Sequence, residues 1–285
     1  MNFIDIASYQ AGIDLSVIFS QNPIDGVIVK ATEAVNYINP YFKGWVDWLN
    51  NNNKSFGVYH YCYGANAWSE AEHFYSVVQP YIGRCVPCAD YENPATNQGT
   101  EWLKRFLDKF YELSGVKCLV YCSQSVTQSQ NFNAIAQDGY RLWMAQYADY
   151  SPVYGFKDNP WHKGSVSPFL GYAMHQYTSC GVLNGWSKYL DFDLFYGNEQ
   201  DWNDLCGDRE EPVILKDVDP DIVMRVLNGE FGIGGERVNK LRAEGYDPDK
   251  VQAKINELYS VAGKVKPIVG NHIEYLQPIM KIVEG

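Results

Sequence analysis

Eight short apolar segments recur through the first two hundred residues, and helical patterns separate most of the early ones. We expect strands at residues 3–6, 26–31, 56–61, 85–90, 117–121, 141–146, 171–176 and 190–193. Helices are expected near residues 41–50, 69–78, 100–113, 128–136 and 200–205. Strands that alternate with helices favour a sheet closed into a barrel. Because the later connections are short or irregular, we predict an α/β fold, an irregular TIM-like barrel with incomplete outer helices.

Two carboxylates, Asp90 and Glu92, stand two residues apart at the end of the fourth apolar segment. Residues i and i+2 of a strand share a face, so the two side chains are expected side by side. Like charges at that spacing push one carboxyl toward its protonated form, which gives the acid and the anion that a glycosidase needs. Asp5, Glu33 and Asp191 are expected at the C-terminal ends of other strands, where barrel sites form. The pair of Asp90 and Glu92 could instead lie in a solvated loop, Asp5 could cap a turn, and Asp191 could be a surface acid at a strand end.

Composition excludes several classes of protein. The formal net charge is −11 and no basic run stands out, so nucleic acid is not an expected partner. No apolar stretch reaches roughly 18 residues, which predicts no membrane insertion. The first residues lack a basic start and Asp5 interrupts their apolar run, so we expect no secretory signal. The seven cysteines are then expected to be reduced, and no second pair completes a zinc set with Cys85 and Cys88.

The chain changes in character after residue 206, because every Cys and Trp lies at or before that position. We expect a barrel over residues 1–206, a linker over 207–218, a module of three short helices over 219–262 and a tail of unassigned structure over 263–285. Asp219 and Pro220 supply an N-cap and a first-turn proline for the module. In the barrel, Ser69 with Glu72 has the spacing of a capping box. About forty residues make a marginal core, so the module is expected to bind rather than catalyse.

Seven motifs of the first part resemble, in order and spacing, the glycoside hydrolase family 25 lysozymes. They are the segments 5–10 (DIASYQ), 30–33 (KATE), 57–61 (GVYHY), 90–92 (DYE), 142–147 (LWMAQY), 176–178 (QYT) and 190–195 (LDFDLF). The resemblance implies a muramidase that cleaves the β-1,4 bond between N-acetylmuramic acid and N-acetylglucosamine. It implies no cofactor and no metal. Ala34 replaces the Gly that usually follows Thr-Glu in this family.

The resemblance also implies roles for individual residues. Glu92 matches the general acid, and its pKa is expected to be raised by burial and by the charge of Asp90. Asp5, Asp90 and Asp191 match the other acids of the site. Asp193 stands where the family often has Asn, so no catalytic role is carried to it. The expected substrate-binding side chains, some of which could simply pack, are Glu33, Tyr61, Trp143, Tyr147 and Gln176. His60 and His175 are expected to be hydrogen-bonded core residues.

The second part is similar to a small wall-binding repeat of pneumococcal and other Gram-positive phage lysins. Phe231, Arg237 and Tyr246 match the repeat and are expected to bind the wall, although a structural role fits Arg237 and Tyr246 as well. Only one clear copy is present, so self-association could supply avidity. The expected partner is bacterial peptidoglycan.

The expected biology is that of a phage endolysin, made in the host cytoplasm without a signal peptide and released through a holin pore to act on the wall. A bacterial autolysin and a wall-binding protein with an inactive barrel remain alternatives. A peptidoglycan amidase or peptidase would require a zinc set or a Cys–His pair. Cys62 lies near His60 in sequence, but no motif supports such a pair.

Overall fold

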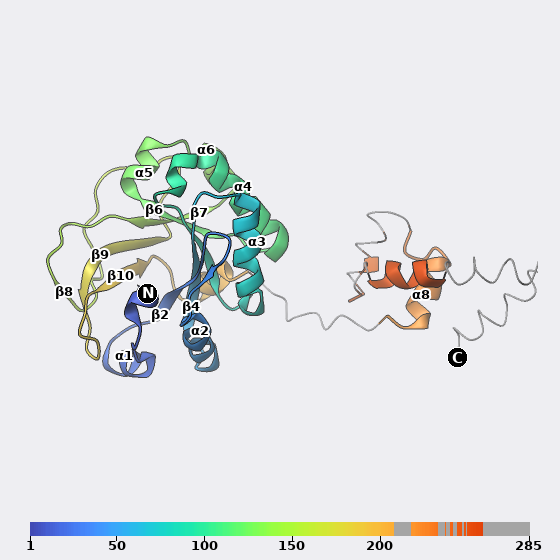
Figure 1. The fold of residues 1–285 in the computed structure, drawn as a ribbon, viewed down its shortest axis with the longest axis horizontal. Coiled ribbons are helices and arrows are strands. Elements are labelled where there is room, and N and C mark those ends of the chain that lie inside the picture. The colour runs from blue at the N-terminus through green and yellow to red at the C-terminus, as the bar shows by residue number, and fades with distance from the viewer. Residues whose placement is uncertain are drawn as a thin grey trace, which may run out of the picture. The chain divides into compact units, whose positions relative to one another are not determined.

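The computed structural model describes residues 1–207, 218–232, 237, 240–241, 244–246, 248 and 250–258. The chain divides into two compact units, Met1–Asp208 and Arg209–Gly285, each of which is described by itself (Figure 1). The expected tail and nearly all of the expected linker lie outside the described residues. Within the described residues, no helix has the length and apolar character needed to cross a membrane.

Eight strands of the first unit close into a barrel, because β1 pairs with both β2 and β10. The strands in barrel order are β1 (Asn2–Ile6), β2 (Gly26–Glu33), β4 (Ser55–Tyr61), β5 (Val86–Asp90), β6 (Leu119–Ser123), β7 (Arg141–Ala145), β9 (Met174–Val182) and β10 (Leu190–Phe195). Neighbours are parallel except at β10, which runs antiparallel to both β9 and β1. The predicted barrel is confirmed and each expected strand overlaps an observed one, but β9 begins three residues later than the strand expected at 171–176.

Helices cover the outside of the barrel unevenly (Figure 1). The connections as far as β7 carry α1 (Leu15–Gln21), α2 (Phe42–Asn51), α3 (Ala67–Val78), α4 (Thr100–Ser114), α5 (Gln124–Ser129) and α6 (Asn133–Gln137). Three 3-10 turns, η1 (Ser8–Gln10), η2 (Gln79–Tyr81) and η3 (Ala95–Gln98), and two short strands, β3 (Tyr37–Ile38) and β8 (Val153–Tyr154), complete the connections. Between β7 and β10 the chain forms loops and β8 instead of helices, which confirms the incomplete outer ring.

Local sequence accounts for the course of these elements, and three expectations need correction. Helix α3 begins two residues earlier than expected, because Asn66 caps it by accepting hydrogen bonds from the backbone N–H groups of Trp68 and Ser69. The prediction of a capping box formed by Ser69 and Glu72 is therefore wrong. The single helix expected over 128–136 is two short helices, α5 and α6, and α1 was not expected. Ala34 adopts the left-handed region with φ of 49°, which is where a glycine would relieve strain.

The barrel interior is filled with side chains at its N-terminal end. Helix α7 (Glu199–Leu205) closes this end, and the ring of Trp202 lies 4.3 Å from Phe3 and 5.1 Å from Phe195 between centroids. Cys88 belongs to this inner core, whereas Cys85 packs in the outer core between barrel and helices. The two thiols therefore lie on opposite faces of the segment. The N-terminal end of the barrel is thus filled with apolar side chains, and polar side chains line the C-terminal end.

The second unit begins with α8 (Pro220–Leu227), which Asp219 caps by accepting a hydrogen bond from the N–H of Ile222 at 3.0 Å. Helical residues recur at 237, 240–241, 248 and 250–258. They surround a small apolar core of Ile222, Val223, Val226, Phe231, Leu241, Tyr246, Val251 and Ile255. The expected C-terminal helices are thus present.

Candidate active site

A small acidic cavity of about 140 Å³ opens at the end of the barrel opposite α7. Its lining is made of carboxyl, phenol, indole and amide groups, from Asp5, Tyr59, Asp90, Glu92, Tyr121, Trp143, Tyr147, Gln176 and Asp191. The structure therefore brings together all four acids expected to be catalytic. It also brings three of the five expected substrate-binding residues to the same cavity.

Strand direction explains how acids far apart in sequence meet. Asp5 lies near the end of β1, and Asp90 is the last residue of β5. Asp191 is the second residue of β10, so its expected place at the C-terminal end of a strand is wrong. Because β10 is antiparallel, its beginning lies on the rim where the parallel strands end, and Asp191 pairs in register with Asp5. Glu92 follows β5 instead of lying on it, and still reaches the cavity.

Burial is the main cause of the raised pKa values of the acids in this cavity. It raises the pKa of Asp5 and Asp90 well above the ordinary range, and it raises the pKa of Asp191 to about 6. Burial also raises the pKa of Glu92. The charge of Glu92 adds to the rise at Asp90, which is only 8% exposed. Repulsion between two carboxylates is mutual, so the expected effect of Asp90 on the pKa of Glu92 stays a prediction.

A hydrogen-bond network orders one wall of the cavity. The amide Nε2 of Gln176 donates to Oδ2 of Asp5 at 2.6 Å. Its Oε1 accepts from the hydroxyl of Tyr121 at 2.8 Å and also from the hydroxyl of Tyr147. Trp143 is only 2% exposed and its ring lies 4.6 Å from that of Tyr121. Trp143 thus packs beneath the cavity, while Gln176 links Asp5 to the two phenols.

Sequence reasoning missed two residues of this site and gave a third, Asp193, no catalytic role. Tyr59 and Tyr121 line the cavity, and Asp193 lies fully buried beside Asp5 and Asp191. The signal was the two-residue period of a strand, because Asp193 follows Asp191 as Glu92 follows Asp90. Oδ1 of Asp193 accepts a hydrogen bond from Nε1 of Trp143 at 2.8 Å.

A β-bulge in β2 decides where its polar side chains point. Lys30 pairs with Tyr59 of β4, but the next pair joins Thr32 to His60, so one residue of β2 is extra. The bulge brings Lys30 and Glu33, three residues apart, onto one face. Their Nζ and Oε2 atoms form an ion pair at 2.6 Å.

The pair of Lys30 and Glu33 flanks the acidic cavity without lining it. Nζ of Lys30 lies 4.6 Å from the ring centroid of Tyr61, which pairs in register with Asp90. The positive charge of Lys30 lowers the pKa of Asp90 and so opposes the effect of burial. Glu33 and Tyr61, both expected to bind substrate, therefore stand at the edge of the site.

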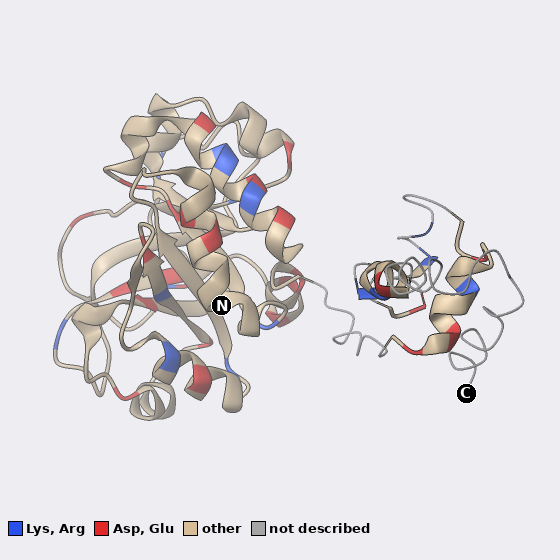
Figure 2. Cartoon of the chain, turned by 45° about the vertical axis from the view of Figure 1, so that its right-hand side comes forward, with Lys and Arg blue, Asp and Glu red and all other residues tan. Residues whose placement is uncertain are grey.

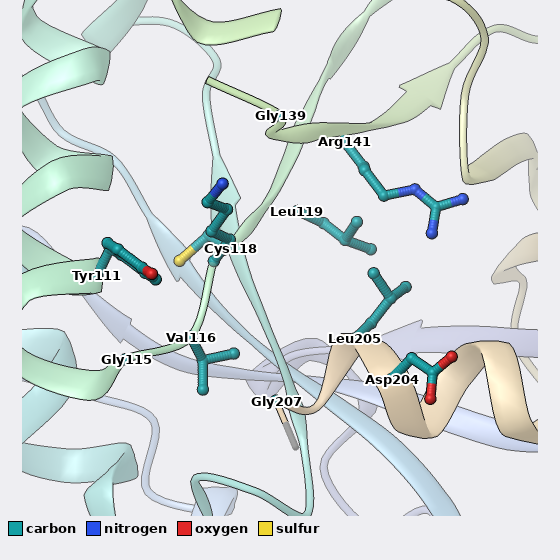
Figure 3. Close-up of a pocket in the computed structure, with 11 residues that line it drawn as sticks. Tyr111, Gly115, Val116, Cys118, Leu119, Gly139, Arg141, Asp204, Leu205 and Gly207 are labelled. Atoms are coloured by element: carbon teal, nitrogen blue, oxygen red, sulfur yellow. The ribbon is translucent and has the colours of Figure 1, made fainter. Parts of the chain in front are cut away.

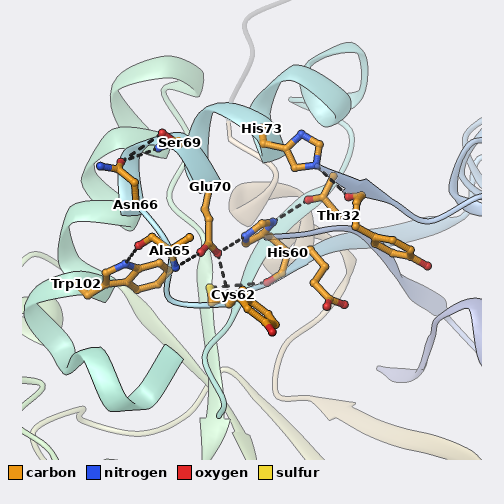
Figure 4. Close-up of polar contacts among 12 residues, drawn as sticks. Thr32, His60, Cys62, Ala65, Asn66, Ser69, Glu70, His73 and Trp102 are labelled. Carbon is orange, nitrogen blue, oxygen red and sulfur yellow. Dashed lines mark hydrogen bonds and ion pairs between the residues drawn. The ribbon is translucent and has the colours of Figure 1, made fainter. Parts of the chain in front are cut away.

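A second polar cluster is buried where β2 and β4 meet helix α3, away from solvent (Figure 4). Nδ1 and Nε2 of His60 are hydrogen-bonded to Oγ1 of Thr32 at 2.8 Å and to Oε2 of Glu70 at 2.9 Å. Glu70 also accepts from the backbone N–H groups of Tyr63 and Ala65. All three side chains, Thr32, His60 and Glu70, are fully buried, so the hydroxyl–imidazole–carboxylate series serves to hold the bulge and the loop after β4.

The other histidine expected in the core behaves in the same way. His175 is fully buried, and its Nε2 is hydrogen-bonded to the backbone carbonyl of Gln146 at 2.8 Å. Burial lowers the pKa of both His60 and His175. The predicted core role of the two histidines is confirmed.

Two larger cavities of the barrel unit lack a group of acids. One of about 290 Å³ lies near the starts of β6 and β7 and includes Arg141 and Asp204 (Figure 3). Another of about 400 Å³ lies around Phe169 and Tyr172 and has no carboxyl in its lining. Lysine and arginine are scattered over the described elements (Figure 2). The acidic cavity is therefore the candidate active site because of its four carboxyl groups and not because of its volume.

The three residues expected to bind the wall lie in the second unit, and two of them are core residues. Phe231 is 2% and Tyr246 7% exposed. Arg237 donates from Nε to the carbonyl of Gly232 at 3.1 Å and from Nη1 to Gln252 at 3.3 Å. The three side chains therefore support the fold of the module, and Arg237 is the one that remains partly exposed.

Family models settle the relationship of this chain to known proteins. The model described as glycosyl hydrolases family 25 matches residues 4–186, well over half of the chain. The chain belongs to glycosyl hydrolase family 25. A second model, that of the CW_7 repeat, matches residues 220–259 of this family 25 hydrolase. The expected family and the expected C-terminal repeat are both confirmed.

Individual relatives agree with the family model. The lysozyme of Streptococcus phage Cp-7 is 28% identical over 265 residues, which cover 90% of this chain and 69% of the phage protein. The autolytic lysozyme of Clostridium acetobutylicum is 27% identical over 197 residues, 68% of this chain but only 56% of the clostridial protein. The bacterial lysozyme from Streptomyces coelicolor has the same fold, with a TM-score of 0.61 at 21% identity over 72% of this chain and 96% of that one.

Proposed function

We propose that this family 25 hydrolase is an N-acetylmuramidase that cleaves the β-1,4 bond between N-acetylmuramic acid and N-acetylglucosamine of bacterial peptidoglycan. The observation that carries the proposal is the convergence of Asp5, Asp90, Glu92 and Asp191 on one cavity, each with a raised pKa. Such a set holds an acid beside anions, as glycoside hydrolysis requires. The phage and clostridial relatives, both named lysozymes, support the same activity.

We propose Glu92 as the general acid. Glu92 is hydrogen-bonded to Tyr121, and donation by Tyr121 would lower the pKa of Glu92. Burial outweighs this effect, so the pKa of Glu92 stays raised, which favours the protonated carboxyl. Glu92 then gives its proton to the glycosidic oxygen as the bond breaks.

We propose that Asp90, Asp5 and Asp191 supply the negative charge that an oxocarbenium-like centre needs. Lys30 acts on Asp90 and favours its ionised form. Oδ1 of Asp90 is buried and has no hydrogen-bond donor among the described residues. The N–H of a substrate acetamido group would provide that donor, an arrangement that suits participation of the substrate's own carbonyl.

Substrate binding involves the residues around this cavity. We propose that Tyr147 and Gln176 contact the sugars directly, over the packed ring of Trp143, and that Tyr61 and Glu33 contact them at the edge. Exposed aromatic side chains follow the ends of β1 and β4 on the same rim, and sugar rings would stack on them. They are Tyr9, Tyr63 and Trp68, which are 83%, 52% and 58% exposed.

We propose that the C-terminal unit brings the barrel to the wall. The match to the CW_7 repeat and the coverage of the phage lysozyme support this role. Arg237 would contact the wall, while Phe231 and Tyr246 shape the module from its core. The relationship to a phage lysozyme supports an endolysin that reaches the wall from the host cytoplasm through a holin pore, with self-association of a single repeat as a source of avidity.

The decisive test is the chemistry of digested Gram-positive walls. A muramidase releases reducing ends, an amidase or peptidase releases amino groups, and an inactive barrel releases neither. Glu92→Gln is expected to abolish reducing-end release while wall pelleting persists, because it removes the proton donor and keeps the shape. Glu101→Gln on the exposed side of α4 is the matched control. New amino groups without reducing ends would overturn the proposal.

A further inference from the structure

Asp193 is a fully buried carboxyl of the barrel, and no catalytic task has been given to it. Its register partners are Phe3 of β1 and Gln176 of β9, whereas Asp191 pairs with Asp5 one step nearer the rim. The side chain of Asp193 is 0% exposed. It therefore lies one layer below the acids that line the cavity.

The contacts of Asp193 favour a protonated carboxyl. Oδ1 accepts a hydrogen bond from Nε1 of Trp143 at 2.8 Å, but Oδ2 is buried and receives no donor from any described residue. Asp193 lies diagonally across from Asp5 on the paired strands β10 and β1, where the two carboxyls act on each other. Carboxylate oxygens only accept, so two carboxyls bond to each other only when one of them is protonated.

The surroundings favour Asp193 as the protonated partner. The titratable groups that act on it are Asp5 of β1 and Asp191 of β10, and it acts in turn on Tyr147 after β7, Tyr177 of β9 and Cys88 of β5. None of these groups is cationic, and no salt bridge to Asp193 exists in the described part of the chain. An unpaired buried anion is far more costly than a neutral acid. Burial, with the charges of Asp5 and Asp191, accordingly raises the pKa of Asp193.

Asp5 is the better anion of the two. It lines the cavity, where substrate or water can reach it, and its Oδ2 already accepts a hydrogen bond from Nε2 of Gln176 at 2.6 Å. A second hydrogen bond, donated by the deeper carboxyl of Asp193, would hold the carboxylate of Asp5 in one orientation. Hydrogen bonds to a charged acceptor are the stronger kind in proteins.

We propose that Asp193 is a protonated carboxyl that donates its hydrogen to Asp5 and so acts as a positioning residue for the Asp5 carboxylate. Its effect on hydrolysis rests on the proposed function, but its protonation does not. Asn carries an N–H donor at the same position, whereas Leu has a similar shape and none. The two variants therefore separate donation from packing.

The first test observes the proton directly. The full chain would be labelled with ¹³C at the aspartate carboxyl carbons, and spectra of the wild-type protein and of Asp193→Asn would be compared across a pH titration. We expect one carboxyl signal, absent in Asp193→Asn, to stay at the chemical shift of a protonated acid at pH 7. An ionised signal for Asp193 at pH 7 would overturn the proposal, whatever bond the enzyme cleaves.

The second test measures the positioning role. At matched folding, judged by circular dichroism, Asp193→Leu is expected to lose about tenfold or more in kcat relative to Asp193→Asn, since a lost hydrogen bond to a charged group has an effect of at least that order. Equal kcat values for the two variants would refute positioning by donation. If Asp193→Leu does not fold, the titration of the wild-type protein and Asp193→Asn still decides the protonation.

Discussion

The ionised carboxylate of Asp191 is expected to destabilise the folded barrel at neutral pH. Replacing Asp191 should show how much free energy of unfolding this carboxylate costs. Burial raises the pKa of Asp191 from the ordinary 3.8 to about 6. Because a tenfold change in an ionisation constant is worth about 1.4 kcal/mol, ionised Asp191 costs about 3 kcal/mol of folding free energy. The folded pKa is the higher one, so the cost is absent below pH 3.8, grows as the pH rises through 6, and is complete above it. Asp191→Asn should therefore stabilise the protein by up to about 3 kcal/mol at pH 8 and little at pH 4.

Urea unfolding at several pH values measures this effect. All 8 tryptophans lie in the first 202 residues, so tryptophan fluorescence reports on the barrel unit. Asp158→Asn, at an exposed position, is the matched control and is expected to change stability by less than about 0.5 kcal/mol. The same Asp191→Asn variant should lose wall hydrolysis if Asp191 serves the reaction. A stability difference that is independent of pH would refute the electrostatic explanation, and a loss of stability at pH 8 would reverse its sign.

Two further predictions concern the edge of the site and the second unit. Lys30→Met removes the charge that lowers the pKa of Asp90, so the acidic side of the pH–rate profile should move to higher pH, whereas Lys43→Met on α2 should leave it in place. An unchanged acidic side would mean that ionised Asp90 is not required. Deleting residues 208–285 should weaken co-sedimentation with purified walls while the hydrolysis of soluble wall fragments stays within about threefold, since the barrel core is complete by Cys206. Undiminished co-sedimentation would show that the C-terminal unit does not target the wall.

Much of the barrel was predictable because the repeat of apolar side chains along a strand or a helix is visible within a few residues. The segment ending at Asp90, the apolar stripe of α4 and the cap at Asp219 all carry their signal within a few residues. The start of α3 was less clear, because Asn66 and Ser69 are both acceptable caps and only one is used. Competition between equivalent local signals is decided by the packing of the helix.

The residues alone predicted that Asp5, Asp90 and Glu92 would meet on one rim, since they follow apolar strands whose ends converge in a barrel. The direction of β10 could be known only from the folded chain, and this direction brings Asp191 to that rim from the start of its strand. The fold also buries Asp193 one layer deeper than Asp5 in the barrel. The physical reason is that the pKa of a carboxyl depends on its desolvation and on neighbours brought from distant strands.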